Sequence, residues 1–130
     1  MNRAGPGMPI ALLLACAVAC SAAPVNISDI SQDEFLANRA SYAIVLDVRR
    51  ADEFAGGHVP GALNVPHDQL AARLPELGLD SDAPVVVYCR SGRRAGLAGS
   101  VLLEAGFTDV RHLVGDMSGW RESGRPIVQP

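Results

Sequence analysis

Residues 84–106 read PVVVYCRSGRRAGLAGSVLLEAG and place an apolar run, a basic loop and a helical segment in direct succession. The apolar run at 85–88 is too short for a helix and is typical of a strand that is buried on both faces. The pattern predicts a helix over about 93–105, which Gly106 would end. The basic loop from Cys89 to Arg94 is therefore expected at a strand-to-helix turn.

Cys89, the first residue of this loop, is the candidate reactive residue. N–H groups at the start of a helix are unpaired, and the helix dipole adds partial positive charge there. Three arginines of the loop add full charges: Arg90, Arg93 and Arg94. A thiol in such surroundings ionises more readily than a free one. Gly92 allows the backbone to turn, so that successive N–H groups can line a cradle for an anion or for a persulfide on Cys89.

The rest of the chain alternates in the same way. Ser31 and Glu34 form a capping box that starts a helix ending near Asn38. The apolar run at 42–46 fits another buried strand. Further candidates are strands at 62–65 and 110–114, and helices over 68–77 and 118–123. This order predicts an α/β fold, in which helices cover both faces of a parallel sheet.

Sites in such sheets form outside the carboxyl ends of the strands. Two polar clusters are expected there: Asp47-Val48-Arg49, and the loop that begins at Cys89. Other polar and aromatic residues are given structural roles. His58 is interpreted as a loop residue, and Glu53 as a helix-start charge. His67 and His112 are expected to face solvent, and Trp120 is expected in the core.

An ordered set of short motifs resembles the rhodanese domain family. The motifs are Asp47-Val48-Arg49, Glu53-Phe54, Gly57-His58-Val59-Pro60-Gly61-Ala62, Tyr88-Cys89-Arg90-Ser91-Gly92-Arg93-Arg94, Gly106-Phe107 and Trp120. The likeness covers about residues 27–128 and extends to the small exported phage-shock rhodaneses, which share the Gly-Arg step in the loop. It implies a five-stranded parallel sheet and sulfur transfer from donors such as thiosulfate to thiophilic acceptors such as cyanide or thiols.

The resemblance also implies roles for individual residues. Cys89 matches the persulfide carrier, and the residues that match the substrate-binding loop around it are Arg90, Ser91, Gly92, Arg93 and Arg94. Asp47 and Arg49 match polar residues that brace the domain. Two positions depart from the family pattern. Many relatives have Asn in place of Arg93, which bears on donor preference, and Gly115-Asp116 replaces Gly-Gly, which we expect to alter a turn only.

Two other functions stay open. Cysteine-dependent phosphatases and arsenate reductases resemble Cys-x5-Arg, whereas Cys89 and Arg94 are spaced as Cys-x4-Arg. The smaller ring of N–H groups suits a single sulfur atom better than a tetrahedral oxyanion. The other alternative is a non-enzymatic binding module, a role often taken by rhodanese-like domains that have lost the cysteine. The presence of Cys89 argues against it.

The N-terminal segment is typical of an export signal. Arg3 precedes an uncharged apolar run at 8–20 that is shorter than the about 20 residues needed to span a bilayer. Small residues at 17–19 offer a cleavage site before Cys20, as in signals that resemble those of bacterial lipoproteins. The expected divisions are a signal peptide at 1–19, a linker at 20–26 and a rhodanese-like domain at 27–130. We expect a periplasmic protein that is anchored by lipid on Cys20; the alternatives are ordinary secretion with Cys20 unmodified, and a buried N-terminal helix.

The composition limits the classes of molecule that the protein is expected to bind. The net charge of −3 argues against a general affinity for nucleic acid. All 11 basic residues are arginines, which hold anions through a rigid fork of donors. The cysteines, Cys16, Cys20 and Cys89, have no zinc-binding spacing, and we expect neither a metal nor another cofactor. The expected partners are a small anionic sulfur donor, a thiophilic acceptor and, through the lipid, a membrane.

Overall fold

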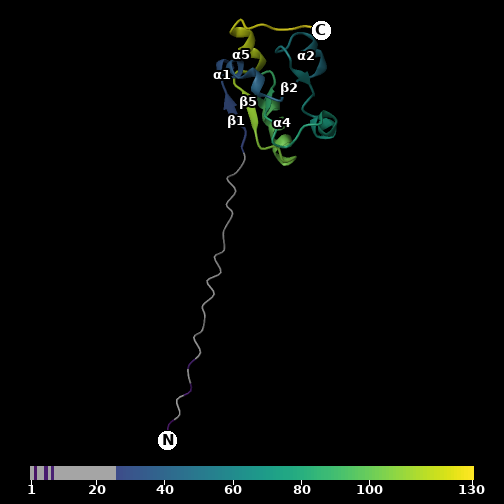
Figure 1. The fold of residues 1–130 in the computed structure, drawn as a ribbon. Helices are drawn as coiled ribbons and strands as arrows, with labels where there is room; N and C mark the ends of the chain where they lie inside the picture. The colour runs from purple at the N-terminus through teal and green to yellow at the C-terminus, as the bar shows by residue number, and fades with distance from the viewer. Residues whose placement is uncertain (1, 3–4, 6, 8–25) are drawn as a thin grey trace.

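A computed structural model describes residues 2, 5, 7 and 26–130, and its strands form one parallel sheet (Figure 1). The strands are β1 (Ser28–Ile30), β2 (Ile44–Asp47), β3 (Leu63–Asn64), β4 (Val85–Tyr88) and β5 (Val110–Leu113). Their order across the sheet is β1-β5-β4-β2-β3, so β4 lies at the centre. The predicted signal cleavage site and Cys20 lie outside the described residues.

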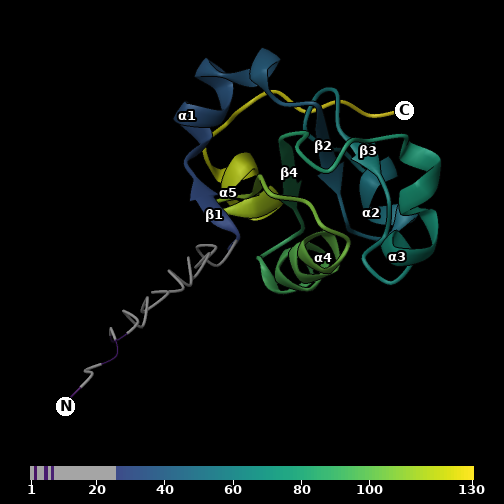
Figure 2. The ribbon, with the colours of Figure 1, turned by 60° about the horizontal axis from the view of Figure 1, so that its bottom comes forward.

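Helices cover both faces of the sheet, as predicted (Figure 2). The helices are α1 (Gln32–Ala37), α2 (Ala51–Ala55), α3 (Leu70–Arg73), α4 (Arg93–Glu104) and α5 (Asp116–Glu122), with 3₁₀ turns η1 (Arg39–Ser41) and η2 (Leu74–Leu77). One core cluster joins α3 and α4 to the sheet through Leu70 and Leu102. The other joins α1 and α5 to the opposite face through Phe35 and Trp120. Among the helices of the described part of the chain, none is long and apolar enough to cross a membrane.

The ends of the helices follow the local chemistry of the sequence. Ser31 caps α1, and its Oγ accepts the N–H of Glu34 at 3.1 Å. After α4, Gly106 adopts a φ of 95°, a left-handed conformation that suits glycine. Every residue of β4 is buried, as its unbroken apolar run predicts.

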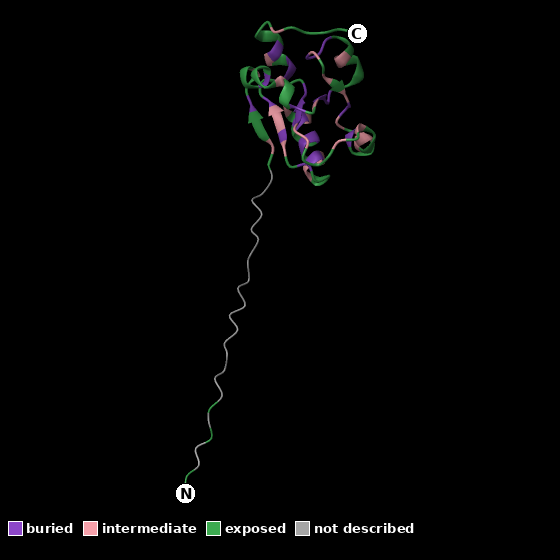
Figure 3. Ribbon diagram, viewed as in Figure 1, coloured by how far each residue is buried: buried purple, intermediate pink, exposed green. Residues whose placement is uncertain are grey.

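Two elements differ from the prediction. The helix expected over 68–77 is divided into α3 and η2, because Pro75 lies in the first turn of η2 and has no N–H to continue the α-helical bonds. Strand β1 has no signal in the sequence, because two of its three residues are exposed and its apolar pattern is therefore weak. It forms the edge of the sheet, whereas buried residues gather at the centre (Figure 3).

Candidate active site

Cys89 lies at the carboxyl end of the central strand and just before α4. The residue is 1% exposed, and its Sγ accepts the backbone N–H of Gly92 at 3.0 Å. Gly92 has a φ of 115°, a conformation that residues with a Cβ rarely adopt. The turn thus directs a main-chain donor at the sulfur from the N-terminal end of a 12-residue helix. This arrangement favours negative charge on the sulfur.

The residues that follow Cys89 have different surroundings. Arg90, Ser91 and Arg93 are exposed. Arg94 is directed to Glu53 on α2, with Nη1 donating to Oε1 at 2.6 Å and Nη2 to Oε2 at 3.1 Å. This hydrogen-bonded pair raises the pKa of Arg94. The same pair lowers the pKa of Glu53 to about 2.

A cleft of about 380 Å³ opens beside the cysteine loop. Its lining residues are Arg49, Arg50, Glu53, Arg90, Met117, Ser118 and Arg121. Guanidinium groups outnumber the single carboxylate in this lining, so the cleft suits an anion. Of the arginines in the cysteine loop, Arg90 is the one in the lining.

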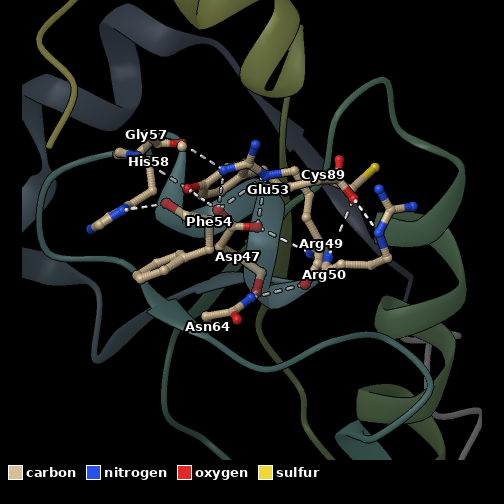
Figure 4. Close-up of polar contacts among 12 residues, drawn as sticks. Asp47, Arg49, Arg50, Glu53, Phe54, Gly57, His58, Asn64 and Cys89 are labelled. Atoms are coloured by element: carbon tan, nitrogen blue, oxygen red, sulfur yellow. Dashed lines mark hydrogen bonds and ion pairs between the residues drawn. The ribbon is translucent and has the colours of Figure 1, made fainter. Parts of the chain in front are cut away.

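Asp47 and Arg49 form a buried ion pair next to this cleft (Figure 4). Arg49 Nη2 donates to Asp47 Oδ2 at 2.7 Å and to the Gly57 carbonyl at 2.8 Å. The Tyr88 hydroxyl donates to Asp47 Oδ2 at 2.7 Å and accepts the N–H of Val59 at 3.1 Å. Burial, together with the Asp47 carboxylate, raises the pKa of Tyr88. The network ties β2, β4 and the segment after α2 together at the edge of the sheet that carries Cys89.

The family model of the rhodanese-like domain matches residues 31–123 of the sequence. The chain belongs to the rhodanese-like family. Within the described residues, no group of three or more His, Cys, Asp or Glu side chains is placed to hold a metal ion.

Similar proteins include sulfurtransferases from distant organisms. A sulfurtransferase of Allochromatium vinosum is 38% identical over 87 residues, which cover 67% of this chain and 79% of that protein. The chloroplastic thiosulfate sulfurtransferase 16 of Arabidopsis thaliana is 38% identical over 93 residues, 62% of this chain and 76% of that protein. These rhodanese relatives support a sulfur-transfer function in general.

Solved rhodanese structures have the same fold. A rhodanese-related protein from Thermoplasma volcanium superposes with a TM-score of 0.69 at 28% identity, over 79% of this chain and 99% of that chain. A human single-domain sulfurtransferase superposes with a TM-score of 0.67 at 27% identity, over 75% and 97%. The five-stranded parallel sheet implied by the family resemblance is thereby confirmed.

Two residues of this rhodanese-like domain were misjudged from the sequence. His112 does not face solvent: it is partly buried, with Nε2 2.9 Å from Asp116 Oδ2 and Nδ1 3.2 Å from Asp29 Oδ1. Asp116 does more than alter a turn, because its buried carboxylate accepts the N–H of Cys89 at 3.0 Å. The signal that pointed to this contact was Asp116 itself, at a position where the family has glycine.

Trp120 and His58 lie as predicted. Trp120 is 1% exposed and packs in the core beneath α1. His58 lies in a loop, where its ring stacks on Phe54 with the centroids 3.6 Å apart and its Nδ1 is 3.0 Å from the Phe54 carbonyl oxygen. Both residues therefore belong to the packing of the domain.

Proposed function

We propose that the protein is a sulfurtransferase of the thiosulfate sulfurtransferase type, which carries sulfane sulfur as a persulfide on Cys89. The observation that carries the proposal is the N–H of Gly92 directed at Cys89 Sγ, at the start of α4 and beside the arginine-lined cleft. A main-chain donor and a helix terminus stabilise negative charge on a thiolate. A persulfide is also an anion, and the same groups stabilise it.

The reaction has two halves. The thiolate of Cys89 attacks the outer sulfur of a donor such as thiosulfate, an S–S bond forms, and the donor's own S–S bond breaks as sulfite leaves with the electron pair. An acceptor then attacks the terminal sulfur of the persulfide, and the bond to Cys89 Sγ breaks, which restores the thiolate. Cyanide gives thiocyanate in this step, and a thiolate acceptor becomes a persulfide.

The lining and the volume of the cleft are suited to the binding of a small anionic sulfur donor. Arg90, Arg50 and Arg121 line it together with the buried Arg49, and its volume of about 380 Å³ leaves room for the donor next to the sulfur loop. Arginine forks bind planar or tetrahedral oxyanions through paired hydrogen bonds. Thiosulfate held there by its sulfonate oxygens would direct its outer, sulfane sulfur toward Cys89.

The decisive experiment measures thiocyanate formation from thiosulfate and cyanide. The wild type is expected to turn over with ping-pong kinetics, and mass spectrometry after thiosulfate treatment should find one added sulfur on the Cys89 peptide. Cys89→Ser should abolish both signals, whereas Cys20→Ser, a matched change at the other cysteine of the expected mature chain, should keep them. Full activity in Cys89→Ser, or no turnover in the wild type, would overturn the proposal.

If the protein were a cysteine-dependent phosphatase, a different assay result would be expected. It requires the arginine that closes the loop to clamp a tetrahedral oxyanion, but Arg94 is engaged by Glu53 on α2. Hydrolysis of an aryl phosphate by the wild type should therefore be absent, and its presence, together with its loss in Cys89→Ser, would favour the phosphatase instead.

A further inference from the structure

A buried carboxylate lies directly behind the reactive loop. Asp116, the first residue of α5, is 2% exposed, and its Oδ1 accepts the backbone N–H of Cys89 at 3.0 Å. The same side chain lies near the other end of the turn, because a Cβ added to Gly92 would be 3.4 Å from Asp116 Oδ2. Both residues of the Cys89–Gly92 hydrogen bond therefore lie close to one carboxylate.

The backbone at Asp116 has a conformation that is uncommon for a residue with a side chain. Asp116 has a φ of 55°, and it is the one residue other than glycine with positive φ in the described part of the chain. Its neighbour Gly115 also has positive φ, at 88°. The conformational free energy of this backbone is higher for aspartate than it would be for glycine. The carboxylate at this position is therefore expected to have a function that compensates for this conformational cost.

His112 provides a counter-charge for the carboxylate. Its Nε2 lies 3.0 Å from Asp116 Oδ1 and 2.9 Å from Oδ2, and its Nδ1 lies 3.2 Å from Asp29 Oδ1. An ionised carboxylate only accepts hydrogen bonds, so a ring with a carboxylate at each nitrogen is satisfied when both nitrogens carry a proton. The hydrogen bond to Asp116 raises the pKa of His112. The arrangement thus favours an imidazolium.

The tertiary fold brings these groups together from separate elements. Asp29 on β1 pairs in register with His112 on β5, and Asp116 begins α5 four residues after His112. From the cysteine loop, the uncharged Gly92 faces the imidazole, since an added Cβ would lie 3.7 Å from its Cε1 and Nε2. Asp29 is largely exposed, whereas Asp116 is buried, so the carboxylate that acts on the loop is Asp116.

We propose that His112 and Asp116 form a positioning pair for Cys89. Asp116 fixes the main chain of the cysteine, and the positive charge of His112 offsets that carboxylate, so that it does not oppose a thiolate or persulfide on the sulfur. The inference rests on the proposed function of Cys89, and neither residue touches the substrate. Without the imidazolium, a bare carboxylate that accepts the backbone N–H of Cys89 would disfavour the anionic form of the sulfur of this residue.

The test uses the full chain and distinguishes the effect of the His112 charge on Cys89 from the effect of lost hydrogen-bond geometry. The rate at which iodoacetamide alkylates the Cys89 peptide is followed against pH by mass spectrometry. In His112→Gln the carboxylate loses its counter-charge, and the pH midpoint of alkylation should rise by about one unit. In His112→Gln/Asp116→Asn the two amides can still bond to each other and to the N–H of Cys89 without charge, and Asn tolerates positive φ. The midpoint should therefore return to within about 0.3 units of the wild type.

Three further measurements complete the experiment. The value of kcat/KM for thiosulfate at pH 7 should fall about tenfold in His112→Gln and recover most of this loss in the double variant. His67→Gln, a matched change at a histidine that follows β3, should alter neither readout. In Asp116→Asn, an NMR titration of the His112 ring should show proton loss about one pH unit lower than in the wild type.

Three outcomes would each overturn the proposed pair. The first is an unchanged pH midpoint of Cys89 alkylation in His112→Gln, the second is a double variant that recovers neither this midpoint nor kcat/KM, and the third is an unchanged His112 titration in Asp116→Asn. The third measurement remains informative if His112→Gln does not fold. Failure of the proposed function has a different signature: the wild type transfers no sulfur, yet the alkylation midpoint still responds to His112.

Discussion

The guanidinium of Arg94 binds the carboxylate of Glu53 through two parallel hydrogen bonds, of 2.6 Å and 3.1 Å. Arg94 belongs to α4 and Glu53 to α2, so the pair joins the helices that follow β4 and β2 at the edge of the sheet that carries Cys89. Glu53 also lines the cleft. The family resemblance implies a substrate-binding role for Arg94, and this contact shows that its guanidinium is hydrogen-bonded to a carboxylate of the protein itself.

The Arg94–Glu53 pair predicts a pH dependence of stability. The hydrogen bond from Arg94 lowers the pKa of Glu53 from 4.5 to about 2. A carboxyl group whose pKa is lowered by folding stabilises the fold above its unfolded pKa, and this contribution is lost as the pH falls toward the folded value. Urea unfolding should therefore show that Glu53→Gln is less stable than the wild type at pH 6, by a margin that shrinks between about pH 4.5 and pH 2. Glu104→Gln, at an exposed position, should show no such change, and a margin independent of pH for Glu53→Gln would contradict the prediction.

The cleft predicts unequal effects of the loop arginines on donor binding. Arg90 lines the cleft, whereas Arg93 is exposed outside its lining. Arg90→Ala should raise the KM for thiosulfate about tenfold, because it removes a charged donor from the anion site. Arg93→Ala should raise the KM about two- to threefold at low salt and not at all in 0.5 M salt, because salt screens an exposed charge that does not line the cleft. Steady-state kinetics at both salt concentrations test this ranking, which the reverse order would refute.

The buried network around Asp47 predicts a large difference between two tyrosines. The Tyr88 hydroxyl donates to Asp47 and accepts the N–H of Val59. Tyr88→Phe leaves both groups without this partner and should lower the free energy of unfolding by about 1–3 kcal/mol. Tyr42 is the matched control, because its buried hydroxyl has no hydrogen-bond partner among the described residues. Tyr42→Phe should cost less than about 0.5 kcal/mol in the same urea titration, and equal costs would argue against the network.

Two glycines on either side of the start of α4 predict opposite effects of alanine. Gly92 has a φ of 115° and donates to Cys89 Sγ, whereas Gly96 lies within the helix with open space where a Cβ would be. Gly92→Ala should cost about 1–3 kcal/mol of stability and remove most of the sulfur-transfer activity, because the strained turn can no longer hold its N–H on the sulfur. Gly96→Ala should stabilise the protein by up to about 1 kcal/mol at unchanged activity. Thermal unfolding and initial rates distinguish the two, and full activity in Gly92→Ala would contradict the role of this turn.

The elements around Cys89 could be predicted because their signals are local. An unbroken apolar run determines β4, and the arginines and Gly92 that follow it mark the turn into α4. The capping box at Ser31 is similarly local. Strand β1 could not be predicted, because its three residues gain their place from pairing with β5 rather than from their own pattern.

The contacts behind the cysteine loop could not be predicted for a related reason. His112 meets Asp29 because two strands distant in sequence pair in register, and it meets Asp116 because the chain turns sharply after β5. In the sequence, His112 has no visible partner and reads as an exposed residue. The engagement of Arg94 by Glu53 is hidden in the same way, since the two residues are 41 positions apart.

The last prediction concerns the compartment. We expect cleavage just before Cys20, lipid on that residue, and a domain held at a bacterial membrane on its periplasmic side. Arg3 and the short apolar run that ends in small residues motivate this expectation. Full-length protein expressed in a Gram-negative host should be found in the membrane fraction. Cys20→Ser, which removes the acceptor of the lipid, should not be anchored there.

The export prediction has a chemical consequence that a thiol titration can measure. Cys16 would leave with the signal peptide and Cys20 would be blocked as a thioether, so the denatured mature protein should show one titratable thiol, Cys89. A second thiol nearby could trap Cys89 in a disulfide in an oxidising compartment, whereas a single thiol can alternate between thiolate and persulfide without an internal competitor. Unprocessed protein in the cytoplasm would refute export. A soluble periplasmic form with two titratable thiols would retain export but refute lipidation, and with it the protection that a single thiol gives.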